Sequence, residues 1–413
     1  MKILIVHQNF PGQFLHLAPA LVEHGHEVHA LVLKKEVPPQ WSGVTLHAYQ
    51  PTKGTAPTVH PWALDLETKI IRAESVFRKC LALREQGFSP DVVLAHPGWG
   101  ESLFIKDVWP KTKLGIYCEL NYSESGNDVG FDPEFKSEDP GDSCRLRLKN
   151  LNNVMHFDLA DGAISPTHFQ ADTYPWPFRS KIKVFHDGID TKLIAPSPTA
   201  RFQINATTSV SHTDEVITFA NRNLEPYRGY HIFMRSLPRL LRERPNAKIV
   251  IVGGDGVSYG RKPVGDKSWK TIFAEEVQPQ IDPKDWARVF FVGHLPHKEF
   301  ISLLQVSTVH VYLTYPFVLS WSLLEAMSAG CAIVGSDTEP VREFIQDQEN
   351  GVLTPFFDNE KLAENVIHLL ENPELRQKLG SAARKKIQYF YDLKSICLPR
   401  LVNWVDALSP ALD

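Results

Sequence analysis

The chain has 413 residues, with 44 Lys and Arg against 48 Asp and Glu and a formal net charge of −4. At roughly 150 residues per domain, this length predicts two or three domains that can each bury a core. The near-neutral balance argues against binding to duplex nucleic acid, which usually requires a positive excess. A hydrophobic content of 43% and a charged content of 22% are typical of a globular protein and exclude a disordered one.

The sequence also lacks the signals of membrane and secreted proteins. No apolar run reaches the roughly 18 residues that a membrane-spanning helix requires. The segment Met1–Val6 lacks the basic region, the longer apolar region and the small-residue cleavage site of a secretory signal. The five cysteines are scattered and form no CxxC pair, which favours a reducing compartment over a disulfide framework or a cysteine zinc site. We therefore expect a cytoplasmic protein.

The first segment is typical of a strand, a turn, a helix and a second strand. Lys2–Val6 is a short apolar run, and the apolar side chains after it recur at helical spacing between Phe14 and Val22. Pro19 lies inside this expected helix and should bend it. The chain then becomes apolar again at Glu27–Val32. This pattern predicts a βαβ unit in a parallel sheet.

Similar apolar runs recur along the chain in two series. The further strands expected lie at residues 91–95, 114–118, 162–165 and 182–185 in the first series, and at 216–220, 248–252, 289–292, 309–313 and 332–335 in the second. Residues 191–213, between the series, are rich in Thr, Ser, Ala and Pro and lack periodicity, which predicts a linker. We therefore expect an α/β protein with two Rossmann-like domains that face each other across a cleft. Residues 121–143, rich in Asp, Glu, Ser and Gly, should form a long loop.

The strongest candidate site follows the first strand of the second series. Arg222 and Arg228 leave this strand, and Gly229 stands before a helix that should start near Tyr230. Guanidinium groups bind phosphate oxygens in a fork, and N–H groups at a helix N-terminus add partial positive charge. The pattern indicates an anion site, although spacing alone fits two solvated loop arginines equally well.

A second candidate site follows the strand expected at residues 309–313. A short loop leads into a helix from about Ser320, and Glu325 lies one turn inside that helix. A carboxylate there can accept hydrogen bonds from both hydroxyls of a ribose, and the loop amides of residues 318–321 can face a diphosphate. The alternative is structural, because Ser322 and Glu325 have the spacing of a helix capping box.

Gly12 and His96 are the candidates in the first half of the chain. Gly12 lets the backbone approach a ligand, or it serves only a tight turn. His96 follows an expected strand and should point toward the cleft, where it contacts substrate or is hydrogen-bonded within its own loop.

Other patterns argue against other functions. The glycine-rich segment 253–260 is not a GxGxxG fingerprint, and the aromatic residues are not interleaved with basic runs as in a nucleic-acid surface. The histidine groups lack a fourth ligand at zinc spacing, so no metal is expected. These groups are His294 and His297 with Glu299, and His24, His26 and His29.

Over nearly its whole length the chain resembles the retaining glycosyltransferases of family 4, and a bacterial branch in particular. The motifs that carry the resemblance are His24–Val28, Phe185–Asp190, Asn223–Gly229, Phe317–Ser322 and Leu323–Gly330. The resemblance implies the GT-B fold. Its parts would be an acceptor-side domain at residues 1–195, a linker at 196–213, a nucleotide-sugar domain at 214–392 and a last helix at 393–413 that returns to the first domain.

The resemblance also implies roles for the candidate residues. Arg222 and Arg228 match basic residues on the donor diphosphate, and Glu325 matches the second of two glutamates in the family motif. Phe317 replaces the first glutamate, so the usual carboxylate contact to the donor sugar is missing. The residues expected at the donor are Gly12, Phe317, Val318, Leu319, Ser320 and Glu325, and those expected to act in catalysis are Arg222, Arg228 and His96.

The implied reaction transfers a hexose from a nucleoside-diphosphate sugar to a hydroxyl of a glycan or lipid-linked acceptor, with retention of configuration. It implies no metal and no cofactor. No nucleic acid is expected as a partner, and the charge balance leaves open a weak contact with the cytoplasmic face of the inner membrane. The alternatives are a non-hydrolysing sugar-nucleotide epimerase and a degenerate GT-B module that binds nucleotide or glycan without turnover.

Overall fold

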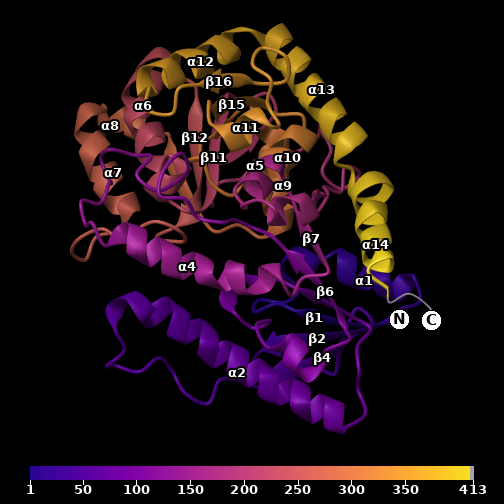
Figure 1. Cartoon of the computed structure of the whole chain (residues 1–413). Coiled ribbons are helices and arrows are strands. Elements are labelled where there is room, and N and C mark those ends of the chain that lie inside the picture. Colours follow the sequence, from indigo (N-terminus) through magenta and orange to yellow (C-terminus); the bar gives the residue numbers. More distant parts are fainter. Residues whose placement is uncertain (410–413) are drawn as a thin grey trace. The chain divides into compact units, whose positions relative to one another are not determined.

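The structure is a computed structural model that describes residues 1–409, and the chain forms two compact units (Figure 1). Unit 1 comprises Met1–Gly188 and the C-terminal segment that begins at Leu393, and unit 2 comprises Ile189–Asp392. The chain thus enters unit 2 seven residues before the boundary expected at residue 195. The reason is that the two ends of unit 2 are tied together, because the Ile189 N–H donates to the Tyr391 carbonyl oxygen at 2.9 Å.

Unit 1 is built on a mostly parallel sheet. Its strands are β1 (Lys2–Val6), β2 (Glu27–Leu33), β3 (Gln40–Trp41), β4 (Val44–Tyr49), β5 (Val92–Ala95), β6 (Lys113–Tyr117), β7 (Gly162–Ser165) and β8 (Ile182–Val184). They form one eight-stranded sheet in the order β3-β4-β2-β1-β5-β6-β7-β8, in which β3 runs antiparallel to β4. Its helices are α1 (Leu17–Glu23), α2 (Leu64–Glu85), α3 (Ile105–Val108), α4 (Asp142–Phe157), α5 (His168–Asp172) and α14 (Leu398–Ala407).

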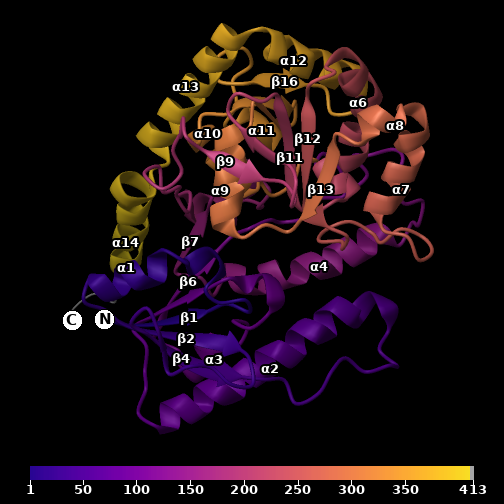
Figure 2. The ribbon, with the colours of Figure 1, turned by 180° about the vertical axis from the view of Figure 1, so that it is seen from behind.

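Both faces of this sheet are buried, which explains why its strands are continuous apolar runs. Ile3 and Ile5 of β1 belong to a core that includes α1 and α14, whereas Leu4 and Val6 pack on the opposite face with α2 and α3. Figures 1 and 2 show α1 and α14 side by side. The expected bend at Pro19 is wrong, because α1 begins only at Leu17 and a proline in the first turn gives up no helical hydrogen bond.

Unit 2 has a second parallel sheet. Its strands are β11 (Val216–Asn223), β12 (Lys248–Gly254), β13 (Val289–Gly293), β14 (Val309–Tyr312), β15 (Ala332–Ser336) and β16 (Val352–Thr354), in the order β13-β12-β11-β14-β15-β16. Its helices are α6 (Tyr230–Glu243), α7 (Trp269–Val277), α8 (Pro283–Trp286), α9 (His297–Val306), α10 (Trp321–Ser328), α11 (Glu339–Arg342), α12 (Asn359–Glu371) and α13 (Pro373–Phe390). The expected α/β class with two Rossmann-like domains is confirmed.

The segment expected to be a linker is a folded part of unit 2. It contains an antiparallel hairpin of β9 (Arg201–Gln203) and β10 (Ser209–Ser211). Phe202 and Val210 are buried in a core with Leu303 of α9, and Figure 2 shows β9 beside this helix. The sequence concealed the hairpin because each of these three-residue strands carries a single buried apolar side chain.

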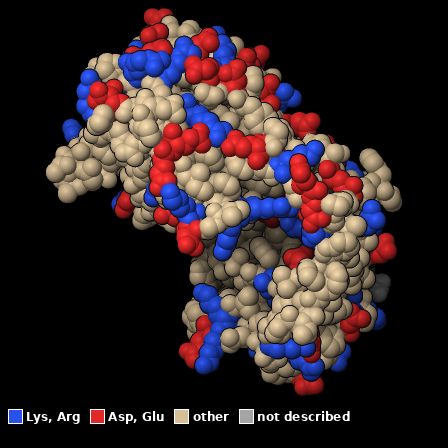
Figure 3. Space-filling model, turned by 90° about the vertical axis from the view of Figure 1, so that its left-hand side faces the viewer, with Lys and Arg blue, Asp and Glu red and all other residues tan. Residues whose placement is uncertain are grey.

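Charged side chains of both signs are mixed on the face of the molecule that Figure 3 shows. On the face in Figure 3, Lys and Arg lie among Asp and Glu. This distribution agrees with the net charge of −4.

Candidate functional site

Arg228 lies at the carboxyl end of the unit 2 sheet, where open α/β sheets bind their ligands. A single turn at Pro226–Arg228 joins β11 to α6, and Gly229 follows it with φ +67°. A Cβ atom at Gly229 would lie 2.4 Å from the Leu313 Cβ, so only glycine fits against the strand end. The Pro-Tyr-Arg-Gly sequence therefore fixes the backbone that carries Arg228.

The Arg228 side chain is also fixed. Its exposed fraction is 5%, and its Nη1 donates to Thr314 Oγ1 at 2.8 Å and to the Val318 carbonyl oxygen at 3.0 Å. Within residues 1–409, the Nε and Nη2 atoms make no hydrogen bond to protein. The other three N–H groups of the guanidinium are therefore available to an anion.

Phe317 packs close to this guanidinium, and its expected place at the sugar donor stays a prediction. Its exposed fraction is 3%, and its ring centroid lies 5.8 Å from the Arg228 Cζ. Tyr259 provides a second aromatic ring near Arg228, and the centroid of this ring lies 5.1 Å from the Arg228 Cζ. The contact with Tyr259 was not predicted, because this residue is far from both Arg228 and Phe317 along the chain.

Arg222 differs from Arg228 in its surroundings. It lies on β11 where the pairing with β12 shifts register between Ala220 and Asn223, and its side chain is exposed. Of the two arginines expected at the diphosphate, Arg228 is thus fixed by hydrogen bonds and Arg222 is exposed. The role of Arg222 stays a prediction.

Some backbone groups of the loop before α10 form hydrogen bonds with other protein groups. The Val318 carbonyl oxygen accepts from Arg228, and Leu319 is a core residue with an exposed fraction of 8%. The Ser320 N–H donates to the Tyr312 hydroxyl at 2.9 Å, and the Ser320 side chain caps α10 by accepting the Ser322 N–H at 3.3 Å. An amide contact from Ser320 to a diphosphate would therefore have to replace the Tyr312 hydroxyl.

Glu325 is paired with His297, a histidine that was considered above only as a metal ligand. Its Oε1 lies 2.7 Å from His297 Nε2, and its side chain is 13% exposed. The hydrogen bond that the Glu325 carboxylate accepts raises the pKa of His297, whereas partial burial lowers it by a smaller amount. Because Ser320 caps α10, Glu325 is the fifth helical residue, and a capping box with Ser322 does not form.

In unit 1, Gly12 is explained by a histidine ring. Its φ is +47°, and a Cβ atom there would lie 2.1 Å from the His7 Cε1. His7 Nδ1 accepts the Asn9 N–H at 3.0 Å, so its Nε2 carries the proton that it donates to Gln13 Oε1 at 2.7 Å. The close approach that glycine permits at this position is therefore to His7.

A hydrogen-bond chain runs from His7 through Gln13 to Glu119, and the His96 ring lies near its end. Gln13 Nε2 donates to Glu119 Oε1 at 3.3 Å, and His96 Nε2 lies 3.7 Å from Glu119 Oε2. His96 Nδ1 accepts the Gly98 N–H at 3.2 Å, so the Nε2 atom that faces Glu119 carries the proton. Burial lowers the pKa of His96 to about 4, which keeps its ring neutral at pH 7. Sequence reasoning found His96 but missed Glu119, which follows β6 two residues after its end.

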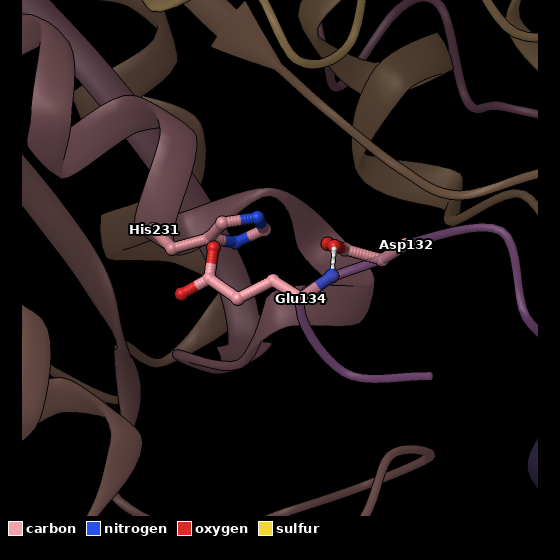
Figure 4. Close-up of side chains that lie close together, drawn as sticks. All are labelled: Asp132, Glu134 and His231. Atoms are coloured by element: carbon pink, nitrogen blue, oxygen red, sulfur yellow. Dashed lines mark hydrogen bonds between the residues drawn. The ribbon is translucent and has the colours of Figure 1, made fainter. Parts of the chain in front are cut away.

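Side chains of the types that can ligate a metal ion occur in both units. Figure 4 shows Asp132 and Glu134 of the loop before α4, with the Glu134 N–H donating to the Asp132 carboxylate at 3.0 Å, and it also shows His231 of α6. Asp132 and Glu134 belong to unit 1 and His231 belongs to unit 2. Within residues 1–409, neither unit by itself brings three such side chains together, and the expectation of no metal stays a prediction.

Two family models match the chain, and together they cover most of it. The model described as "Glycosyl transferase family 4 group" matches residues 24–194, and the model described as "Glycosyl transferases group 1" matches residues 202–386. Among residues 1–409 there is no helix long and apolar enough to cross a bilayer.

Curated relatives match over part of their length. Spore coat protein SA of Bacillus subtilis is 28% identical over 51% of this chain and 55% of its own. Phosphatidyl-myo-inositol mannosyltransferase of Mycolicibacterium smegmatis is 26% identical over 46% of this chain and 45% of its own. The match thus spans about half the length of these relatives.

Solved structures match over the whole chain. Sucrose-phosphate synthase of Thermosynechococcus elongatus superposes with a TM-score of 0.73 at 16% identity, covering 99% of this chain and 100% of that one. Alr3699/HepE of Anabaena, solved in complex with UDP and glucose, has a TM-score of 0.68 at 15% identity and covers 98% and 100% of the two chains. At such identities the likeness shows the fold.

Proposed function

This chain belongs to the glycosyl transferase family 4 group and has the GT-B fold, and we propose that it is a retaining glycosyltransferase. The proposed donor is a nucleoside-diphosphate hexose, and the proposed acceptor is a hydroxyl of a glycan or a lipid-linked glycan. No metal or organic cofactor takes part in the proposed reaction. The observation that carries the proposal is the fixed Arg228 guanidinium at the carboxyl end of the unit 2 sheet.

Arg228 has the chemistry that departure of a diphosphate requires. As the bond to the sugar breaks, negative charge grows on the phosphate oxygens and the sugar becomes oxocarbenium-like. A hydrogen-bond donor that is already held in place, as the Arg228 guanidinium is, stabilises that charge without reorganising. One charged hydrogen bond contributes about 1.5–3 kcal/mol, or about one to two orders of magnitude in rate. The exposed Arg222 is proposed as a second cation that moves onto the bound diphosphate.

Glu325 is proposed to bind the ribose of the donor. Its carboxylate lies on α10, which follows directly after the loop that contacts Arg228, so one ligand can meet both groups. The structure of Alr3699/HepE in complex with UDP supports a nucleoside diphosphate as part of the donor, since that protein shares the fold.

Unit 1 offers groups that suit sugar hydroxyls. The neutral His96 ring and the Glu119 carboxylate supply a donor and an acceptor, and a hydroxyl can pair with either. In the proposed front-face mechanism the departing phosphate oxygen takes the proton of the acceptor hydroxyl, so no protein base is needed.

The proposal is tested by donor binding and turnover together. Calorimetry with UDP, GDP, ADP and dTDP should identify one preferred nucleotide, and the matching sugar donor should then transfer its sugar to an acceptor. Arg228→Ala should lower turnover about 100-fold because it removes the fixed cation. Arg242→Ala, an exposed arginine on α6, is the matched control and should leave turnover unchanged. Near wild-type turnover in Arg228→Ala would contradict the proposal.

A binding module without turnover is the second candidate, and Phe317 is the observation that favours it. This buried ring stands where the resemblance implies a carboxylate at the donor sugar. Donor hydrolysis or transfer by the wild-type protein would exclude the binding module. Interconversion of the donor with no acceptor present would instead identify an epimerase.

A further inference from the structure

The segment after β12, residues 255–268, is tied back onto the end of β11. The Glu225 carboxylate, with an exposed fraction of 1%, accepts the backbone N–H groups of Ser258, Tyr259 and Gly260 at 3.1–3.3 Å. Asn223 adds two more links, since its Oδ1 accepts the Gly256 N–H at 3.2 Å and its Nδ2 donates to Ser258 Oγ at 2.8 Å. A buried carboxylate that receives several N–H groups holds the loop in one place.

This anchoring places the Tyr259 ring over Arg228. The Arg228 Cζ lies 5.1 Å from the Tyr259 ring centroid and 5.8 Å from that of Phe317, and the two rings contact each other at 4.8 Å. Both distances are within the range of cation–π attraction. The contacts of Nη1 with Thr314 and Val318 add two further restraints on the guanidinium plane.

We propose that Tyr259 and Phe317 are positioning residues that clamp the Arg228 guanidinium for a diphosphate, and that Glu225 sets the clamp by holding the loop of Tyr259. This inference rests on the proposed function, in which Arg228 binds the diphosphate of the donor. It identifies three residues that act on the ligand through Arg228.

The replacement of a carboxylate by Phe317 has a specific consequence in this arrangement. A glutamate beside Arg228 would pair with the guanidinium and use N–H groups that the ligand needs. A phenyl ring attracts the cation without accepting those hydrogen bonds, so Arg228 keeps its charge and its donors for the phosphate oxygens. The clamp therefore lowers the cost of fixing a long side chain when the ligand binds.

Simple core packing predicts something different for Tyr259. With an exposed fraction of 42%, this ring contributes little to the core, so its removal should affect Arg228 more than the stability of the fold. The phenol hydroxyl is not needed for a cation–π contact, so Tyr259→Phe should behave as wild type.

The test measures the affinity of inorganic pyrophosphate and of the preferred nucleoside diphosphate by calorimetry. Tyr259→Leu and Phe317→Leu should each weaken pyrophosphate binding by about tenfold, and Glu225→Gln should do the same by loosening the loop. Tyr259→Phe should restore wild-type affinity. Tyr389→Leu, which removes a 73% exposed ring on α13, should leave affinity unchanged.

The outcomes separate this inference from the proposed function. If the wild type and both leucine variants bind pyrophosphate equally well, the clamp is rejected and the proposed function stands. If the wild type binds neither pyrophosphate nor any nucleoside diphosphate, the proposed function fails and the clamp fails with it. A second readout is the NMR signal of the Arg228 side-chain N–H groups in the ligand-free protein. Ring currents should displace this signal in the wild type and in Tyr259→Phe but less in Tyr259→Leu, and equal signals in all three would also reject the clamp.

Discussion

At Glu325, one hydrogen bond couples the proposed ribose contact to an imidazole whose pKa is raised by that contact. His297 Nε2 lies 2.7 Å from the carboxylate, and Glu325 raises the pKa of His297. Below that pKa the imidazolium holds one carboxylate oxygen, and above it the neutral ring holds the oxygen less strongly. A ribose that needs both oxygens therefore competes with His297 more easily at higher pH.

We predict that nucleoside-diphosphate affinity increases as the pH rises above 6.5, the ordinary value for histidine, and through the raised pKa of His297. Calorimetry on His297→Gln should show a weaker dependence, because glutamine does not become charged. The ligand's own titration is the same for both proteins and cancels in the comparison. Parallel affinity curves for the two proteins would mean that His297 does not compete for Glu325.

The sequence located the residues of the candidate site better than it located their partners. Arg228 and Glu325 were found because each lies just after a strand and near the start of a helix, a pattern visible within about a dozen residues. Tyr259, in the loop after β12, contacts Arg228, and His297, at the start of α9, contacts Glu325. A single sequence carries no signal for contacts between residues 28 or more positions apart. Glu225 was passed over because a carboxylate that binds backbone N–H groups looks the same in sequence as a solvated one.

At the scale of whole elements, α13 packs against the end of α10 through a glycine. A Cβ atom at Gly380, in the middle of α13, would lie 2.2 Å from the carbonyl oxygen of Gly330. Glycine normally weakens a helix by about 1 kcal/mol relative to alanine. Its presence here is explained by the close approach of the two backbones.

We predict that Gly380→Ala destabilises unit 2 although alanine favours the helix. The clash with a backbone atom should cost about 1–3 kcal/mol of unfolding free energy, and chemical denaturation measures this loss. Ser381→Ala, at the exposed neighbouring position, is the control and should not lower stability. A stabilised Gly380→Ala would show that the two backbones separate without cost.

Elements with strong apolar runs were predictable, and those that depend on tertiary contacts were not. All the strands expected from the sequence occur, because parallel strands buried on both faces read as uninterrupted apolar runs. The strands that were not predicted are β3, β4, β9, β10 and β16. All of them except β4 have two or three residues, which give no periodicity. The long α2 also lacked a signal, because charged residues interrupt its apolar face.

At the scale of the whole molecule, buried histidines make stability depend on pH. Burial lowers the pKa of His96, His156, His186 and His310 to about 4, from an ordinary value of 6.5. Between these values the unfolded chain binds more protons than the folded protein, so stability increases with pH. The stabilisation is complete above pH 6.5 and is lost as the pH falls toward 4.

We predict that the unfolding free energy falls from pH 7 to pH 5 by about 1–2 kcal/mol for each such histidine. His310→Gln isolates one of them, because His310 lies on β14 and its Nδ1 forms a single hydrogen bond within residues 1–409, with the Thr218 hydroxyl at 2.8 Å. Denaturation curves for this variant should depend less steeply on pH than those of the wild type. Equal slopes would show that folding does not change the pKa of His310.

The position of α14 in unit 1 has a consequence for how the chain is made. Every strand of the unit 1 sheet leaves the ribosome before unit 2 begins, yet Leu401, Val402 and Val405, which cover one face of that sheet, emerge only after unit 2 is complete. While the inserted unit folds, this face of the nascent sheet is therefore covered by α1 but not yet by α14. The domain that starts first is thus the one that finishes last, and during translation its open face is the surface on which a chaperone would act.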